Sequence, residues 1–214
     1  MAAKKQTAGA VTITAPDIRL VPVRIQGTAP YVQNKFSAKM REKMLGVQMD
    51  PTKRKQKTRE AKNPEELYEG AMHKLDDGSP GIPASAFRAA MIDACRLVGF
   101  KMTEAKMSVF VQADGFDADD GTPLVRFSGG EPEMTQLTVR NQTGVADVRV
   151  RPMWRKWEAI VRIQYDADQF KEADVLNLLL RAGLQVGVGE GRPFSKKSAG
   201  MGWGTFTIAN LEAA

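Results

Sequence analysis

The sequence has few of the residues from which proteins build disulfide frameworks, zinc sites and catalytic triads. It contains one cysteine, Cys95, and one histidine, His73. A single cysteine excludes a disulfide framework and a multi-cysteine zinc site, and a single histidine disfavours Ser-His triads and histidine-rich metal sites. We therefore expect no metal site, no cofactor and no catalytic residues, and a binding protein rather than an enzyme.

Long apolar runs are also missing. No run reaches the roughly 18 residues that a membrane helix needs, and no apolar stretch of signal-peptide length follows Met1–Lys5. We therefore expect a cytoplasmic protein with no membrane partner. Its 214 residues, 43% hydrophobic and 26% charged, are typical of a globular chain, and we expect one domain over residues 1–214. The net charge of +6 is the one global feature that indicates a partner.

The positive charge is concentrated in one stretch. Between Lys35 and Lys62, ten basic and three acidic residues give a local net charge of +7, so the rest of the chain is nearly neutral. The stretch has no apolar periodicity, which predicts a flexible basic insertion over residues 36–63 that contacts nucleic acid. A merely solvated loop is the alternative. The candidate phosphate contacts are Lys35, Lys39, Arg41, Lys43, Lys53, Arg54, Lys55, Lys57 and Arg59.

A second basic segment alternates with apolar residues. In Val148–Arg151 both arginines leave one face of a strand and both valines the other. Tryptophans then alternate with basic residues, a pattern suited to phosphate contacts and base stacking. The candidates are Arg149, Arg151, Trp154, Arg155 and Lys156. For Trp157, a place at the edge of the core is an equally good interpretation.

Periodicity and turn residues predict the order of the elements. We expect a strand over 18–25, with Pro22 at an edge or bulge, a basic helix over 36–45, a helix that begins at Asn63-Pro64, a helix over 86–98, a β-rich region over 109–165, a helix over 168–181 and a last strand over 205–208. Within the β-rich region we expect hairpins that pair 109–111 with 124–127 and 148–150 with 158–165. The core order β, α, β, β, α, β predicts an α+β fold with a ferredoxin-like antiparallel sheet, the shape of an RNA-recognition (RRM) domain.

A glycine-rich segment precedes the last strand. Residues 187–194 lack the third glycine of a dinucleotide fingerprint and the second glycine of a P-loop. Because glycine has no Cβ, the backbone N–H groups of such a loop can approach a phosphate closely. A long mobile hairpin is the alternative. The candidate contacts here are Arg192, Phe194, Lys196 and Lys197.

Three other features favour a structural role. The acidic tip around Asp117 matches a calcium loop only at Asp119, so we expect a solvated hairpin tip. His73 lies on a predicted helix with no acid–base partner placed beside it by sequence, so a surface or half-buried position is expected. Cys95 lies next to the apolar face of its helix, where a buried, inert thiol is expected.

Two motifs together resemble the RAMP superfamily of CRISPR-associated proteins. Residues 81–90, GIPASAFRAA, are similar to its turn and helix start, and GVGEGRP at 187–193 with GMGWGTF at 200–206 is similar to its C-terminal glycine-rich loop and closing strand. The motifs stand in the order that the superfamily has, around an RRM-like skeleton. Motif by motif the resemblance covers about 25 residues.

The resemblance is nearest to the backbone subunits of Cascade-like effectors, which bind guide RNA through a palm, a finger-like insertion and a thumb-like hairpin. It implies that Ser85 and Arg88 contact nucleic acid, that residues 36–63 form the finger, and that the hairpins of 109–165, around Trp154–Trp157 or the tip near Asp117, form the thumb. The implied partners are guide-like RNA, a complementary target, further copies of the chain along the RNA, and other effector subunits.

The chain also departs from that superfamily. It is short for such a subunit, and it has no arrangement of His, Tyr and Lys like that of the RNA-cleaving members, which favours binding over cleavage. A RAMP-type endoribonuclease, including metal-dependent cleavage through Asp50, stays open. So do a single-stranded DNA-binding or annealing protein of a mobile element and a purely structural assembly protein.

Overall fold

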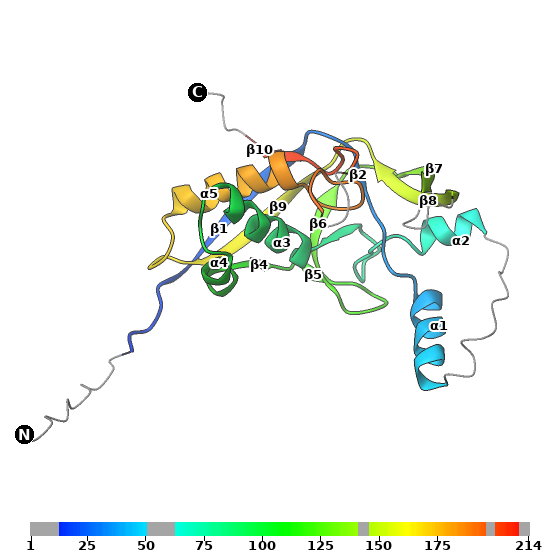
Figure 1. The fold of residues 1–214 in the computed structure, drawn as a ribbon, viewed down its shortest axis with the longest axis horizontal. Coiled ribbons are helices and arrows are strands. Elements are labelled where there is room, and N and C mark those ends of the chain that lie inside the picture. Colours follow the sequence, from blue (N-terminus) through cyan, green and yellow to red (C-terminus); the bar gives the residue numbers. More distant parts are fainter. Residues whose placement is uncertain (1–12, 51–62, 141–145, 196–199, 210–214) are drawn as a thin grey trace, which may run out of the picture.

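We analysed a computed structural model of the chain, which describes residues 13–50, 63–140, 146–195 and 200–209 (Figure 1). Two antiparallel sheets and a set of short helices make up the α+β fold. None of the helices in these ranges has the length and the apolar run that crossing a bilayer requires.

The central strands follow the ferredoxin-like order. The sheet runs β10 (Phe206–Ile208), β1 (Ile18–Gly27), β9 (Glu158–Asp166), β4 (Val109–Gln112), and every neighbouring pair is antiparallel. Helix α3 (Ala84–Ala94) lies between β1 and β4 in sequence, and α5 (Glu172–Arg181) lies between β9 and β10. This arrangement confirms the predicted core order β, α, β, β, α, β.

Pro22 lies where the prediction requires it. It pairs with Arg162 on the β9 side of β1, whereas β10 pairs only with Ile25–Gly27. The other edge of β1 therefore carries no paired strand at Pro22, so its missing N–H breaks no ladder bond.

Three further strands extend the central sheet, and a second sheet stands beside it. Strand β6 (Pro123–Ser128) pairs with the start of β9 and with two short strands, β3 (Gly81–Pro83) and β5 (Gly115–Phe116). The second sheet has the order β2 (Tyr31–Val32), β8 (Ala146–Trp154), β7 (Glu133–Arg140).

Both predicted hairpins are wrong in their pairing. Strand β8 pairs with β7 in the second sheet rather than with β9, and β4 pairs with β9 rather than with the strand at 124–127. The chain changes sheets between Trp154 and Glu158 because both tryptophans of this turn are buried: Trp154 is 1% exposed and Trp157 3%. Burial of these rings outweighs local hairpin pairing.

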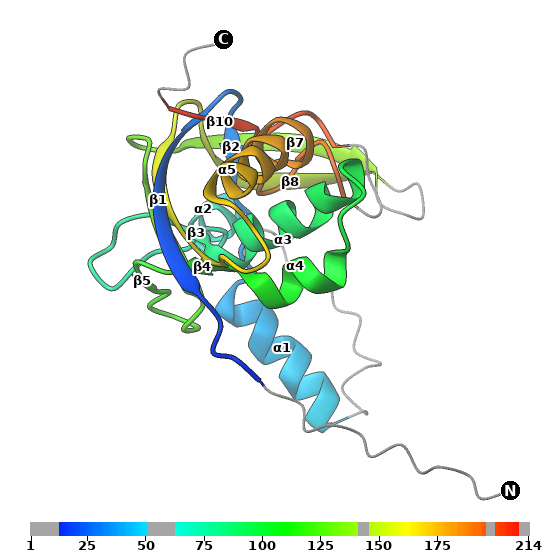
Figure 2. The ribbon, with the colours of Figure 1, turned by 90° about the vertical axis from the view of Figure 1, so that its left-hand side faces the viewer.

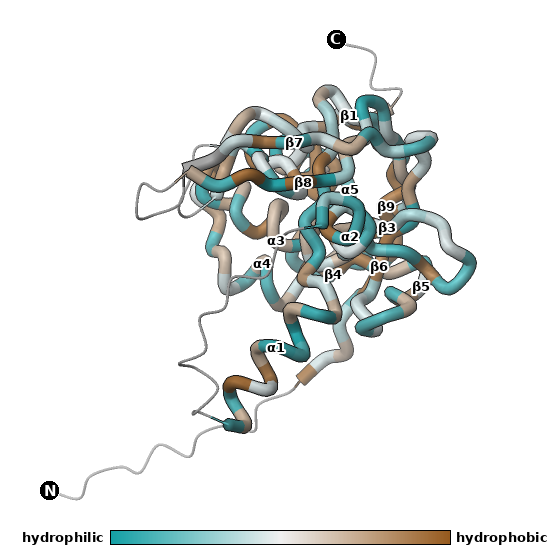
Figure 3. The backbone as a smooth tube through the Cα atoms, turned by 90° about the vertical axis from the view of Figure 1, so that its right-hand side faces the viewer, coloured by the Kyte–Doolittle hydropathy of each residue, from teal (hydrophilic) through white to brown (hydrophobic). Residues whose placement is uncertain are grey.

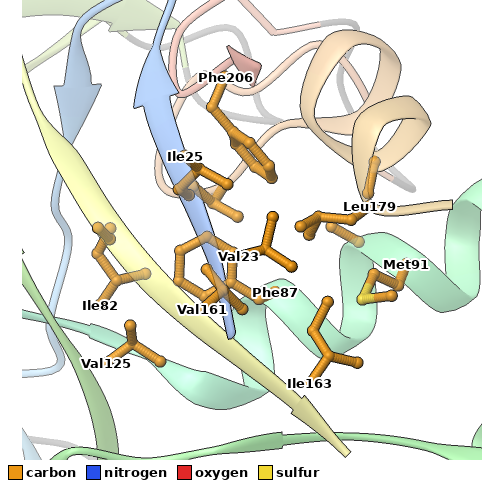
Figure 4. Close-up of a cluster of buried hydrophobic side chains, with 14 of the residues drawn as sticks. Val23, Ile25, Ile82, Phe87, Met91, Val125, Val161, Ile163, Leu179 and Phe206 are labelled. Carbon is orange, nitrogen blue, oxygen red and sulfur yellow. The ribbon is translucent and has the colours of Figure 1, made fainter. Parts of the chain in front are cut away.

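Helices α3 and α5 cover one face of the curved central sheet (Figure 2). Their apolar side chains meet those of β1 and β9, as Figure 4 shows for Phe87, Met91, Leu179, Val161 and Ile163, all buried. The predicted helix over 86–98 ends at Ala94, and a 3-10 turn, η2 (Cys95–Leu97), follows. Cys95 is fully buried, as predicted.

The remaining helices lie at the margins of the fold. Helix α4 (Met102–Ser108) leads into β4, and a π turn, η3 (Ala182–Val186), follows α5. Helix α2 (Pro64–Glu69) begins at its predicted cap, where the Asn63 side chain accepts from Glu65 N at 3.0 Å. Helix α1 (Ala38–Met49) projects from the body of the molecule (Figures 1 and 3), and none of its residues is buried.

We predict that Gly183→Ala destabilises the protein. A Cβ at Gly183 would lie 2.2 Å from the Phe206 carbonyl oxygen and 2.7 Å from its ring, so η3 and β10 would have to move apart. Overpacking of this kind costs about 1–3 kcal/mol. Urea denaturation measures the loss. Gly46→Ala on α1, where no atom lies within 4 Å, is the control and leaves the free energy of unfolding unchanged or slightly raised.

Candidate nucleic-acid interface

The glycine-rich loop over residues 187–204 is fixed to the second sheet. Val188 N donates to Gly204 O at 2.9 Å, Gly204 N to Pro30 O at 2.7 Å, and Glu190 N to Val32 O at 2.9 Å. Gly204 has a φ of 66°, and a Cβ there would lie 1.8 Å from Val188 O, so only glycine fits. These bonds hold the described part of the loop against β2, which does not fit the alternative of a free hairpin.

Two predicted phosphate contacts belong instead to a bridge between the loop and the hairpin β7–β8. Arg149 and Arg151 leave one face of β8, as the alternation predicts, and both pair with Glu190, at 2.9 and 2.7 Å. One carboxylate thus holds two guanidinium groups, and the three side chains together keep one positive charge. Arg192, farther along the loop, donates to Gly189 O at 3.1 Å and stays partly exposed.

The tryptophan prediction is wrong for Trp154. Its ring is buried against Tyr31, with centroids 5.8 Å apart, and its Nε1 donates to Gly130 O at 3.2 Å. A ring so placed offers no face to a base. Trp157 takes the core position that was the alternative, donating to Ala29 O at 2.9 Å. Trp203, which no sequence pattern singled out as a contact, is half-buried against Gly191.

Other predicted contacts are distributed over the surface. Ser85 is exposed at the start of α3. Arg88 donates to Val109 O at 2.9 Å and to Lys106 O and covers the Phe110 ring at 4.6 Å, which ties α3 and α4 to the sheet edge. Phe194 is partly buried beneath Arg96, at 5.8 Å.

Several basic residues outside the glycine loop pair with acidic ones. Lys39 pairs with Glu66 at 3.3 Å, Arg41 with Asp120, and Arg155 with Glu133 at 2.9 Å. The side chains of Lys43 and Lys156 are exposed. The remaining predicted contacts lie outside the described residues; these are Lys53, Arg54, Lys55, Lys57, Arg59, Lys196 and Lys197.

The open face of the central sheet has no stacking platform. The exposed side chains of the two central strands are aliphatic, charged or amide, with Leu20, Pro22 and Gln26 on β1 and Ile160 on β9, and none is aromatic. RNA-recognition sheets stack two or three bases on aromatic residues of these strands. The two central strands thus have the RNA-recognition order without its aromatic surface.

The structure brings together a charged cluster that the sequence did not reveal. Asp117, 3% exposed, accepts from Lys35 Nζ at 2.6 Å and lies 2.6 Å from Nδ1 of His73. Lys35, 6% exposed, also donates to Asp119 at 2.7 Å. The expectations of a solvated tip at Asp117 and of a phosphate contact at Lys35 are therefore wrong, because each residue neutralises the other inside the protein.

The pKa values in this cluster shift because of burial and pairing together. Burial raises the pKa of Asp117, but hydrogen bonds from Lys35, from the Asp119 amide and from His73 outweigh it, and the pKa lies below its usual value. Burial likewise lowers the pKa of Lys35, and its bonds to Asp117 and Asp119 raise it above the usual value. Both groups are therefore charged at neutral pH.

A metal ion does not fit the cluster. Ligand atoms of His73, Asp117 and Asp120 lie within 4.8 Å of one another, which is close enough for a cation. Lys35 and Arg41 already place positive charges on Asp117 and Asp120. A divalent cation would have to displace both, against their repulsion.

Comparison with known proteins gives distant structural likenesses alone. No family model matches the chain, and no curated protein matches it. Among solved structures, that of Cmr6 from Pyrococcus furiosus is similar, with a TM-score of 0.41 and 10% identity over 90% of this chain and 99% of that one. At this distance the likeness carries no information on function, and the fold class rests on the strand order of the chain itself.

We predict that Lys35→Met destabilises the protein in a pH-dependent way. The variant leaves the Asp117 carboxylate buried without its ammonium partner, which costs about 3–5 kcal/mol at pH 7. Because the folded pKa of Asp117 is depressed, its contribution is present above the unfolded pKa of about 4 and is lost as pH falls through the folded value. In the variant the carboxyl protonates more easily, so the difference from wild type shrinks on acidification.

Urea denaturation of wild type and Lys35→Met at several pH values measures the difference in their free energies of unfolding. His73 and Asp119 are present in both proteins, so their contributions are shared. Lys101→Met, which removes an exposed pair with Glu104 at 2.9 Å, is the control and costs less than about 1 kcal/mol. A loss for Lys35→Met that is small, or equal at all pH values, would contradict the assignment.

Proposed function

We propose that this protein is an RNA-binding subunit of RAMP type, which holds guide-like RNA by its phosphates and assembles in several copies along it. The observation that supports this most is the meeting of two segments at β2. The glycine-rich loop is bonded to Pro30 and Val32, and the +7 stretch begins at Lys35, three residues after β2 ends. The glycine-rich loop thus lies beside β2, and the basic stretch begins just after β2 in the chain.

The loop offers hydrogen-bond donors suited to phosphate. In the part that the structure describes, the amides of Gly189, Gly191 and Gly202 donate to no acceptor within the chain. All three glycines have positive φ, between 75° and 82°. Because glycine has no Cβ, a phosphate can approach such backbone N–H groups closely, and Arg192 lies in the same loop. Contacts of this kind hold the sugar-phosphate backbone of a nucleic-acid strand without selecting its base sequence.

Assembly along RNA requires surfaces for a neighbouring copy. Helix α1 carries Met40, Met44, Leu45 and Met49, each about half exposed or more. Methionine side chains adapt to varied contacts, so this helix suits a protein interface. Its lysines allow the same element to lie near the RNA that the copies share.

We expect the triple variant Lys53→Gln, Arg54→Gln, Lys55→Gln to weaken RNA binding and its dependence on salt. Losing three phosphate contacts reduces the slope of log Kobs against log salt by about 2 for a single strand. Fluorescence anisotropy with single-stranded RNA between about 50 and 200 mM salt measures it. The matched control, Lys101→Gln, Lys106→Gln, Lys171→Gln, loses the same charge.

Two outcomes would contradict the proposal. One is a wild-type protein without RNA affinity at moderate salt. The other is an equal effect of the two triple variants, which would mean that net charge alone attracts RNA. Tighter binding to single-stranded DNA than to RNA of the same length would favour a DNA-binding or annealing protein.

A second candidate, a RAMP-type endoribonuclease, is favoured by the contact between His73 and Asp117. A buried carboxylate 2.6 Å from Nδ1 orients an imidazole, and such a pair acts as a general base when its other nitrogen reaches a hydroxyl. The earlier candidate Asp50 caps the C-terminal end of α1, where its backbone N–H donates to Gly46 O.

If the protein cleaves RNA, His73→Ala should lower the rate about 10²–10⁴-fold, the usual contribution of a general base. The measurement is single-turnover cleavage of end-labelled RNA, with and without a chelator. Asp50→Asn is the comparison and should cleave normally. Retained cleavage in His73→Ala would remove this site from consideration.

A further inference from the structure

The segment that contains α1 and α2 leaves the body and returns to it at one buried carboxylate. Lys35 stands before α1 and His73 after α2, and Asp117 contacts both side chains at 2.6 Å. We infer that Asp117 is a positioning residue that sets the direction in which the basic insertion leaves the body. Only the expected effect on RNA affinity rests on the proposed function; the effect of Asp117 on the direction of α1 does not.

Backbone and amide hydrogen bonds join the two ends of this segment next to Asp117. Lys35 N donates to Ala71 O at 2.9 Å, and the Gln33 side chain accepts from His73 N at 2.8 Å. The same Gln33 amide donates to Gly81 O at 2.7 Å, which ties both ends to β3. The outgoing and returning chains are therefore joined to each other and to the sheet.

The loop that carries Asp117 makes further contacts with both sides of the insertion. Asp119 accepts from Lys35, and Asp120 pairs with Arg41 in the first turns of α1. On the returning side, Ala118 N donates to Lys74 O at 3.0 Å. Successive carboxylates of this one loop thus extend from the buried core of the cluster to the base of α1.

Packing alone does not hold α1 in its direction. The helix buries no residue, and its polar contacts with the rest of the described chain include the pair of Arg41 with Asp120 and that of Lys39 with Glu66 on α2. Both pairs are partly or fully exposed and each is weak. The buried pair of Lys35 and Asp117 is therefore the strong contact from which the weaker ones follow.

Removing the charge of Asp117 separates positioning from simple electrostatics. Asp117→Asn makes the protein more positive by one unit, which by itself strengthens RNA binding. The contacts of Asp117 with Lys35 and His73 are called the clamp. Without the clamp the insertion is free to change direction. RNA binding must then order the insertion, and this entropic cost weakens the affinity. The two effects have opposite signs, so the direction of the change identifies the dominant one.

The experiment compares Asp117→Asn with Asp77→Asn, which changes the net charge equally. Asp77 pairs with Arg126 at 2.6 Å on an exposed loop and does not touch the insertion. We expect Asp117→Asn to bind single-stranded RNA about tenfold more weakly than wild type, or about 1.4 kcal/mol, and Asp77→Asn as tightly or slightly more tightly. Folded Asp117→Asn that binds as tightly as Asp77→Asn would overturn the inference.

A distance measurement tests the clamp without RNA. Spin labels at Gln48→Cys on α1 and Gln169→Cys on the body are both exposed, and the buried Cys95 does not compete for the label. The distribution of label distances should be narrow in the wild-type background and in Asp77→Asn and broad in Asp117→Asn. An unchanged distribution in Asp117→Asn would overturn the inference, whereas wild type that binds no RNA would overturn only the proposed function.

A milder variant covers the case in which Asp117→Asn does not fold. Asp120→Asn removes only the contact with Arg41, on a side chain 20% exposed. It should broaden the distribution of label distances. It should also weaken RNA binding by a factor of at most about five, since it removes one partly exposed pair of about 0.2–1 kcal/mol. Narrow distances and unchanged affinity in this variant would likewise contradict the clamp.

Discussion

The pair of Lys35 and Asp117 is the contact on which the placement of the basic insertion depends. A carboxylate with a side chain 0% exposed is stable only if a nearby cation and hydrogen-bond donors replace water. Asp117 finds these donors on both chain segments that border the insertion. The requirement to satisfy one buried charge therefore brings Lys35 and His73, 38 positions apart, to one point of the fold.

A similar use of charge recurs at the glycine-rich loop. Glu190 forms salt bridges with Arg149 and Arg151 and thereby joins the hairpin β7–β8 to the loop. In both places, cations that a sequence pattern assigns to phosphate bind a carboxylate of the same chain. These pairs leave the net charge of +6 unchanged, because it already counts their carboxylates, and the excess positive charge belongs mainly to the +7 stretch between Lys35 and Lys62.

Local patterns predicted the core elements and their order, but not helix α4, the short strands β2, β3 and β5, or the partners of the hairpin strands. The periodicity of Phe87, Ala90, Met91 and Ala94 identified α3, and Asn63-Pro64 identified the start of α2, because caps and apolar faces are local properties. The pairing of β8 with β7, the burial of Trp154 and the cluster at Asp117 depend on contacts across long sequence separations. A pattern of period two shows which face an arginine leaves, not which group that face meets.

Strand β2, only two residues long, is where these constraints combine. Its carbonyls and those just before it accept from the glycine loop, Tyr31 packs on Trp154 and Trp157, and three residues later the chain reaches the Lys35 pair. Because these contacts all lie at or just after β2, they fix the position of the glycine-rich loop relative to the first residues of the insertion. In the proposed function, which needs phosphate contacts and no base readout, this arrangement would set the spacing between the phosphate contacts of the loop and those of the insertion.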